Sequence, residues 1–259
     1  MKRMLFVVTA AAAILAMTGC DYLDKLLGGA YVDKWANLVN ETSHEAVVNG
    51  NTMTYGNHTY TIVSEIDVNT TDFSRPTASV SFSNIPSGYT EFSAVYQKLL
   101  GKSLAGTVAM VPMAMEIYAR DAATGEKCIK LLCLEGAASE MITELKRKIV
   151  PSDSAPEGDS YIQRYIPAAL LKGATPSNSY EPSSPYTVQM TMTPNGVKPA
   201  NMYGGDVTYM YILTSGGWST FQRGVDVFQK SGSTQYKIFG CPSCYTQCMT
   251  ISGDWKGLK

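Results

Sequence analysis

The feature that most constrains the fold is a change of residue period along the chain. Between positions 92 and 171, apolar residues recur every three or four positions, as they do on one face of an amphipathic helix. The stretches on both sides are rich in Thr, Val, Ile and Tyr and are broken by Gly and Asn turns, which is typical of antiparallel strands. Separate runs of helices and strands predict an α+β fold and argue against a parallel βαβ sheet.

The helical run is divided by identifiable start and stop residues. Gly101 is expected to end a first helix that begins near Phe92, and Ser103 to cap a second helix that continues to Arg120. Pro112 is expected to bend this second helix. Further helices are expected at 125–134, 137–148 and 161–171, with a loop at 151–160.

The C-terminal run predicts an antiparallel β-meander, because short strand-like segments alternate with turn clusters. The expected strands are 186–193, 207–214, 224–230, 236–239 and 245–251. Earlier strands are expected at 52–55, 58–67 and 77–82, with a hairpin at Gly56-Asn57. The predicted fold is therefore a helical layer packed on this C-terminal meander. The earlier strands form a small N-terminal β-rich extension, expected as an extra strand layer.

The N-terminus has the layout of a secretory signal peptide. Two basic residues precede an uncharged apolar run at 4–17, which is too short to span a bilayer comfortably, and small residues stand just before Cys20. The ending resembles the lipobox of bacterial lipoproteins, in which the Cys is lipidated; the departure is Met17, where that pattern prefers Leu. We therefore expect a palmitate-bearing lipoprotein, held by Cys20 to a membrane of the bacterial cell envelope. An ordinary signal peptide cut nearby is the alternative.

These observations predict the organisation of the whole chain. The expected parts are a signal peptide (1–19), a lipid-anchored tether (20–29), an N-terminal helix and β-rich extension (30–90), an α+β domain (91–252) and a tail (253–259). The short helix is expected at 30–40. The net charge is −1 and there is no basic run, which argues against a nucleic-acid partner because phosphate neutralisation dominates such binding.

Three cysteines near the C-terminus form the most conspicuous motif. Cys241, Cys244 and Cys248 are expected to form at least one disulfide in an oxidising envelope. Cys241 and Cys244 also have the spacing of a thioredoxin-type pair, but no βαβ context follows them. Zinc bound by the three, with Cys128 or Cys133, is a further alternative.

No recognisable catalytic motif is present elsewhere. Gly101-Lys102-Ser103 lacks the preceding Gly of a phosphate loop, neither His belongs to a metal-spaced pair, and no G-x-S-x-G elbow occurs. We therefore expect no catalytic residue, bound metal or cofactor, and a non-catalytic binding or assembly module at the membrane surface. The alternative is an envelope enzyme, a hydrolase or a thiol-redox protein, whose site the sequence does not reveal.

Aromatic residues suggest what such a module could bind. Tyr203, Tyr209, Tyr211 and Trp218 could form a face for an envelope glycan or protein, or could cover a half-exposed sheet. The methionines of 110–115 are expected in the core, because Met adapts to irregular gaps.

Two blocks of the sequence carry a family resemblance. The block 92–128, FSAVYQKLLGKSLAGTVAMVPMAMEIYARDAATGEKC, and the block 173–187, GATPSNSYEPSSPYT, resemble an uncharacterised bacterial family known only as a domain of unknown function. The segments 215–217 and 223–225 look like divergent versions of its Ser-Gly turn and Arg-Pro-Val strand. Cys241 to Cys244 departs from the family's last strand. The resemblance implies no activity.

Overall fold

A computed structural model of the protein describes residues 43–68, 78–149, 163–251, 255 and 257–259. The chain divides into Met1–Glu41 and Thr42–Lys259, and all described residues lie in the second unit. Cys20, the expected signal peptide and tether, the expected helix at 30–40 and the expected loop at 151–160 lie outside the described residues. Among the described residues, no helix is long and apolar enough to cross a membrane.

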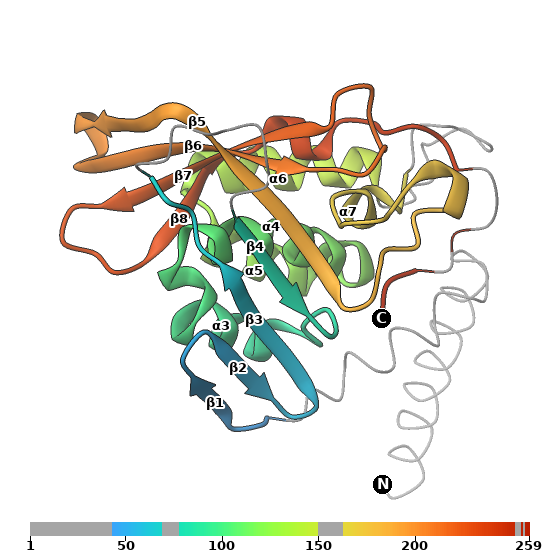
Figure 1. The fold of residues 1–259 in the computed structure, drawn as a ribbon, viewed down its shortest axis with the longest axis horizontal. Helices are drawn as coiled ribbons and strands as arrows, with labels where there is room; N and C mark the ends of the chain where they lie inside the picture. The colour runs from blue at the N-terminus through green and yellow to red at the C-terminus, as the bar shows by residue number, and fades with distance from the viewer. Residues whose placement is uncertain (1–42, 69–77, 150–162, 252–254, 256) are drawn as a thin grey trace, which may run out of the picture. The chain divides into compact units, whose positions relative to one another are not determined.

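A single eight-stranded sheet forms one layer of the fold, and each strand pairs antiparallel with the next along the chain (Figure 1). The strands are β1 Ala46–Asn49, β2 Thr52–Tyr55, β3 His58–Ser64, β4 Ala78–Phe82, β5 Tyr186–Ala200, β6 Gly205–Leu213, β7 Gln222–Lys230 and β8 Tyr236–Gly240. The pairing of β4 with β5, in which Phe82 lies opposite Tyr186, joins the N-terminal strands to the C-terminal meander. The N-terminal extension therefore continues the main sheet and is not an extra layer.

The helices pack together on one face of this sheet, behind it in the view of Figure 1. They are α3 Tyr89–Lys98, α4 Leu104–Arg120, α5 Ala122–Leu132, α6 Glu135–Lys148 and α7 Ile166–Ala169, with short 3₁₀ turns η1 Leu100–Lys102, η2 Pro176–Asn178, η3 Asn201–Tyr203 and η4 Pro242–Tyr245. Inward-facing residues of the sheet, such as Met53, Val80 and Met190, are buried beneath them. The predicted α+β class, with a helical layer on an antiparallel meander, is confirmed.

Helix α4 is the centre of the core. Every residue from Leu104 to Ala119 is buried, including the predicted methionines. The Ser103 side chain accepts a hydrogen bond from the backbone N–H of Gly106, so the predicted N-cap is confirmed. The helix continues through Pro112. Because one helix is buried on all sides, the sheet and the other helices must be arranged around it.

Two expected elements differ from the structure. The segment 245–251 was expected to be a strand, but it begins in η4 and continues without regular structure. Its backbone groups form hydrogen bonds outside the sheet. The Gln163 side chain donates to the C=O of Cys248 and accepts from the N–H of Cys248, each at 2.7 Å. The N–H of Met249 donates to the C=O of Gly217. In the described part of the expected helix 161–171, only Ile166–Ala169 is α-helical.

Two glycines in helices test how tightly α4 and α5 are packed. A Cβ atom on Gly125 would collide with the backbone of Tyr118, whereas a Cβ on Gly136 would meet nothing within 4 Å. We expect Gly125→Ala to lower the free energy of unfolding by about 1–3 kcal/mol through overpacking. Gly136→Ala, its matched control, should raise it by up to about 1 kcal/mol through helix propensity. Urea denaturation measures both, and stabilisation by both substitutions would contradict the packing.

Candidate functional site

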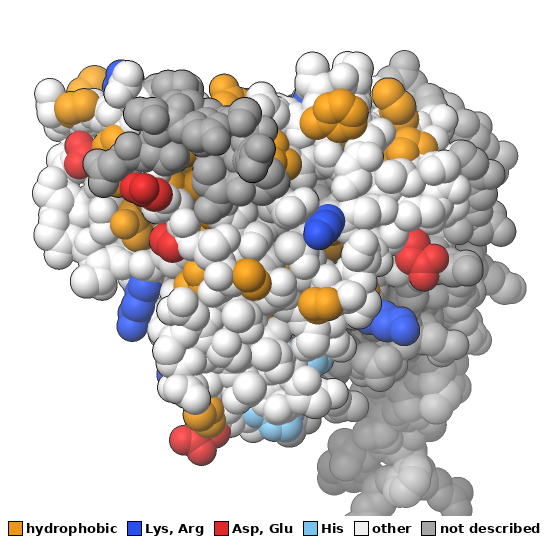
Figure 2. Space-filling model, viewed as in Figure 1, with side chains coloured by type: hydrophobic (Ala, Val, Ile, Leu, Met, Phe, Trp, Pro, Cys, Tyr) orange, Lys and Arg blue, Asp and Glu red, His pale blue; other side chains and the backbone are white. Residues whose placement is uncertain are grey.

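The face of the sheet opposite the helices is open and carries mostly hydroxyl side chains. We define the hydroxyl face as eight polar side chains of β2 to β5 that alternate with buried residues and are half-buried or exposed; the exposed Val63 and Ser64 at the end of β3 and the buried Thr191 of β5 are not included. The eight are Thr52, Thr54, Thr59, Thr61, Ser79, Ser81, Thr187 and Gln189. None of them is charged. Figure 2 looks onto this side of the molecule and shows charged side chains that are scattered and do not gather into one patch. The hydroxyl face can therefore form hydrogen bonds without offering charge.

Strand register places four of these hydroxyls in one row across four strands. Thr52 lies opposite Thr61, Thr61 opposite Ser81, and Ser81 opposite Thr187. The Oγ1 atoms of Thr52 and Thr61 are 3.0 Å apart, and Ser81 Oγ lies 3.3 Å from Thr187 Oγ1. Neighbouring strands are about 4.8 Å apart, so this hydroxyl row is roughly 14 Å long. The Thr52–Thr61 pair uses one hydroxyl proton and leaves the second available, whereas the Thr187 hydroxyl donates to the Pro185 carbonyl oxygen at 3.1 Å.

The four aromatic residues that the sequence suggested do not form one surface. Tyr209 and Tyr211 lie on the open side of β6, where Tyr209 is 40% exposed. Tyr203 instead packs edge-on against Phe228 and Phe239, and Trp218 is buried with the Arg223 guanidinium over its ring. Only Tyr209 and Tyr211 extend the sheet surface, and Tyr209 lies opposite Asp226 of β7.

A buried carboxylate that the sequence analysis missed joins β3 to the start of α3. Glu91 accepts hydrogen bonds from His58 Nδ1 and Tyr60 Oη, both at 2.7 Å, and from the backbone N–H and the hydroxyl of Ser87, at 2.7 and 2.8 Å. Burial alone would raise the pKa of Glu91, but these hydrogen bonds hold it below its ordinary value. The four donors show that the carboxylate serves as an internal anchor. The spacing of Ser87 and Glu91 at a helix start was the available signal.

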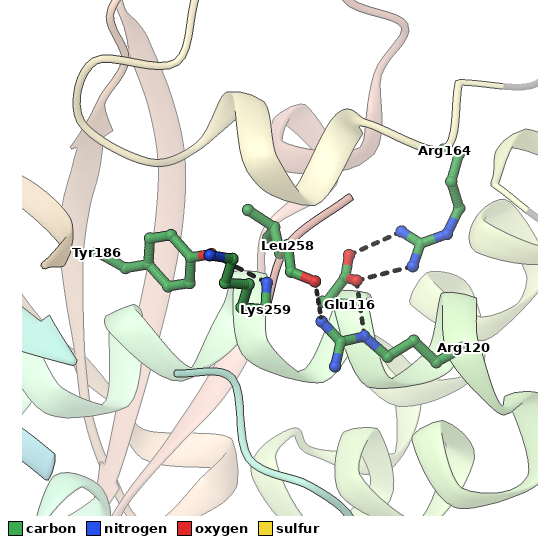
Figure 3. Close-up of polar contacts among 6 residues, drawn as sticks. All are labelled: Glu116, Arg120, Arg164, Tyr186, Leu258 and Lys259. Atoms are coloured by element: carbon green, nitrogen blue, oxygen red, sulfur yellow. Dashed lines mark hydrogen bonds and ion pairs between the residues drawn. The ribbon is translucent and has the colours of Figure 1, made fainter. Parts of the chain in front are cut away.

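A second buried carboxylate lies on α4 (Figure 3). Glu116 pairs with Nε of Arg120 at 2.8 Å and with both terminal nitrogens of Arg164 at 2.7 Å. Burial favours a raised pKa, but the two guanidinium groups hold the pKa of Glu116 below its ordinary value. Arg164 also lies over the Trp255 ring, 4.7 Å from its centroid. The charges of this site are therefore engaged within the protein.

The same site holds the last residues of the chain. Nη2 of Arg120 donates to the carbonyl oxygen of Leu258 at 2.8 Å. The backbone N–H of Lys259 donates to Tyr186 Oη at 2.9 Å, and the N–H of Ile85 donates to the Lys259 carbonyl at 3.1 Å. Residues 258 and 259 are thereby tied to α4, to β5 and to the segment before α3.

The three C-terminal cysteines do not come together. Cys241 and Cys244 flank the first turn of η4, and a hydrogen bond from one thiol to the other, together with burial, raises the pKa of Cys241. Cys248 lies apart, against Tyr180, and burial raises its pKa to about 11. Burial likewise raises the pKa of Cys133 to about 12. A redox-active pair needs a lowered pKa, so the thioredoxin alternative finds no support in this geometry.

The zinc alternative can be compared with the same geometry. All five described cysteines, including Cys128 in α5, are buried free thiols in the structure. Within the described ranges, no three His, Cys, Asp or Glu side chains are grouped so that they could hold a metal ion. The expected disulfide stays a prediction, and the placement of the thiols favours Cys241 with Cys244 as its partners.

Substitution of Glu116 tests the buried ion pair. We expect Glu116→Gln to lower the free energy of unfolding at pH 7 by about 3 kcal/mol, because two largely buried arginines lose their counter-charge. Glu144→Gln, which removes a half-exposed partner of Arg147 and Lys148 at the surface, should cost less than about 1 kcal/mol.

The pH dependence of this loss follows from the lowered pKa of Glu116. A carboxyl whose pKa is lower in the folded state stabilises above its unfolded pKa, about 4.3, and that stabilisation disappears as the pH falls towards the folded value. The difference between wild type and Glu116→Gln should therefore be full at pH 7 and shrink below about pH 4. Denaturant titration from pH 3 to 7 measures it, and a difference that does not change with pH would be inconsistent with the ion pair.

Peptide mapping without reduction, on protein purified without reducing agent, tests the cysteines. We expect a Cys241–Cys244 disulfide and a free Cys248. The closed loop is short, so the double change Cys241→Ser and Cys244→Ser should lower the free energy of unfolding by roughly 2 kcal/mol. A disulfide that includes Cys248 would mean that the thiols are not placed as described.

Two of the segments that carry the family resemblance, 173–187 and 215–217, meet in the fold. Gly173 N–H donates to Ser215 Oγ at 2.7 Å, which joins the block at 173–187 to the turn at 215–217. A Cβ on Gly217 would lie 3.1 Å from Ala169 Cβ and 3.3 Å from the Tyr180 ring, so the turn passes close to both residues. The segment 223–225 lies in β7, next to β6.

Comparison with known proteins identifies a family but no function. No curated protein and no solved structure matches the chain. Residues 84–252 match the family model described as a domain of unknown function, DUF6935. The match begins after β4, so the first four strands of the sheet precede it. Because the match spans more than half of the sequence, the chain belongs to the DUF6935 family.

Proposed function

We propose that the protein is a lipid-anchored, non-catalytic binding or assembly module of the bacterial cell envelope, and that the open face of its sheet is the binding surface. The observation that carries this proposal is the hydroxyl face, on which uncharged polar side chains from four adjacent strands lie at the surface. A sheet surface of this kind suits an extended ligand better than a small substrate, which is usually enclosed in a concave site.

The reactive side chains support the same proposal. Both oxygens of Glu91 and of Glu116 accept hydrogen bonds from protein donors, so neither carboxylate is placed to act as a general base. The raised pKa of Cys241 disfavours the thiolate that a redox reaction needs. The alternative of an envelope hydrolase or thiol-redox enzyme would therefore require groups other than these.

The lipid anchor rests on the sequence before and at Cys20. Acyl chains stabilise membrane attachment by about 0.8 kcal/mol per buried methylene, so two or more chains hold a protein at a bilayer without help from basic residues. In the proposal, the anchor lies N-terminal in sequence to the strands that bind the ligand.

Substitution of Cys20 tests the anchor. We expect Cys20→Ser to abolish incorporation of labelled palmitate and to move the protein from the detergent phase to the aqueous phase after cell fractionation. Cys248→Ser is the matched control, because it changes another cysteine without touching the lipidation motif, and it should stay with the membrane. If Cys20→Ser keeps its label and remains in the detergent phase, the protein is not lipidated at Cys20.

A further inference from the structure

We infer that the ligand of the hydroxyl face is an uncharged polysaccharide. This inference rests on the proposed function, because it names the ligand class of the same surface. The hydroxyl row, formed by Thr52, Thr61, Ser81 and Thr187, is the core of the site, and Gln189 adds one amide beside it.

None of the eight side chains of the hydroxyl face is charged, which favours a neutral ligand over an anionic polymer, a nucleic acid or a protein. An anionic polymer or a nucleic acid would need Lys or Arg to neutralise its charges. Hot spots of protein interfaces are enriched in Trp, Tyr and Arg and poor in Ser, Thr and Val. Ser and Thr dominate the hydroxyl face, and Val47 and Val63 are exposed on the neighbouring β1 and on β3. A neutral polyhydroxyl ligand fits this composition better than an anion or a protein.

The hydroxyl groups also match sugars in hydrogen-bonding capacity. A Ser or Thr hydroxyl donates one hydrogen bond and accepts up to two, as each sugar hydroxyl does. In the Thr52–Thr61 pair, one proton joins the two oxygens, and the other proton and the remaining lone pairs are left for a ligand. In the Ser81–Thr187 pair, Thr187 donates its proton to the Pro185 carbonyl oxygen at 3.1 Å, so this pair offers a ligand its remaining lone pairs. The row is repeated from strand to strand over roughly 14 Å, a span that suits a chain of sugar units.

Two tyrosines supply the apolar contact that sugar rings need. Tyr211 lies on β6 opposite Thr191, four residues along β5 from Thr187, and Tyr209 follows on the same side of β6. The flat face of a phenol ring packs against the C–H groups of a sugar while its hydroxyl remains free to hydrogen bond. A polysaccharide that crosses the hydroxyl row can therefore also contact these rings.

The test is native electrophoresis of the full-length protein in gels that contain a polysaccharide. The neutral probes are amylose, mannan and dextran, and the anionic probe is heparin. A polyoxyethylene detergent keeps the lipid-anchored protein soluble without adding sugar. We expect at least one neutral probe to retard the wild type. Ser81→Glu places a charge within the row and should weaken retardation at least fivefold. Ser139→Glu, the same change on the exposed surface of α6, should leave retardation unchanged.

A second variant guards against misfolding of Ser81→Glu. Thr61→Val keeps the shape and strand preference of the side chain and removes only the hydroxyl, so it should fold and still weaken retardation severalfold. Retardation by heparin alone, retardation by no neutral probe, or equal retardation of wild type, Ser81→Glu and Thr61→Val would each overturn the inference. The Cys20→Ser experiment is independent of these outcomes, so a failed glycan test leaves the lipid anchor to be judged separately.

Discussion

The complete burial of α4 is the constraint on which the rest of the structure depends. A helix buried on every side must be enclosed by other elements, and here the sheet, α5 and α7 enclose it. Its buried Glu116 can remain ionised only beside fixed positive charge, since an unpaired carboxylate in the core would be very costly. Arg120 supplies one charge from the same helix, and Arg164 supplies the other from the segment before α7. The same two arginines hold C-terminal residues against the helix layer: Arg164 lies over the Trp255 ring, and Arg120 donates a hydrogen bond to the Leu258 carbonyl oxygen.

This one-sided arrangement explains the sequence of the strands. Since the helices cover a single face, the inward residues must be apolar, whereas the outward residues of β2 to β5, apart from the buried Thr191, are half-buried or exposed. Such positions would permit Lys and Glu, which are the usual solvent-facing residues. The strands carry Ser and Thr instead, in register across four strands, and this choice is the reason to assign the open face a role in binding.

Local patterns predicted the parts of the fold that local physics decides. The Ser103 cap, the hairpin at Gly56-Asn57 and the strands of the meander follow from side-chain spacing and turn chemistry. The strand expected at 245–251 was wrong because Gln163, far away in sequence, takes the backbone bonds of Cys248. The continuity of the sheet depends on the pairing of β4 with β5, which no local pattern encodes. Glu116 and Arg120 stand four residues apart in an apolar helix, a readable signal, but Arg164 could not be matched to them.

The central claim is that the open face of the sheet is the functional surface, and amide chemical shifts measured during a glycan titration test it most directly. Isotope-labelled protein would be titrated with a neutral oligosaccharide derived from whichever probe retards it. The account predicts shift changes concentrated on β2 to β6, at the hydroxyl row and near Tyr209 and Tyr211, with α4 to α6 unaffected. Changes confined to the helical side, or none at saturating oligosaccharide, would contradict it.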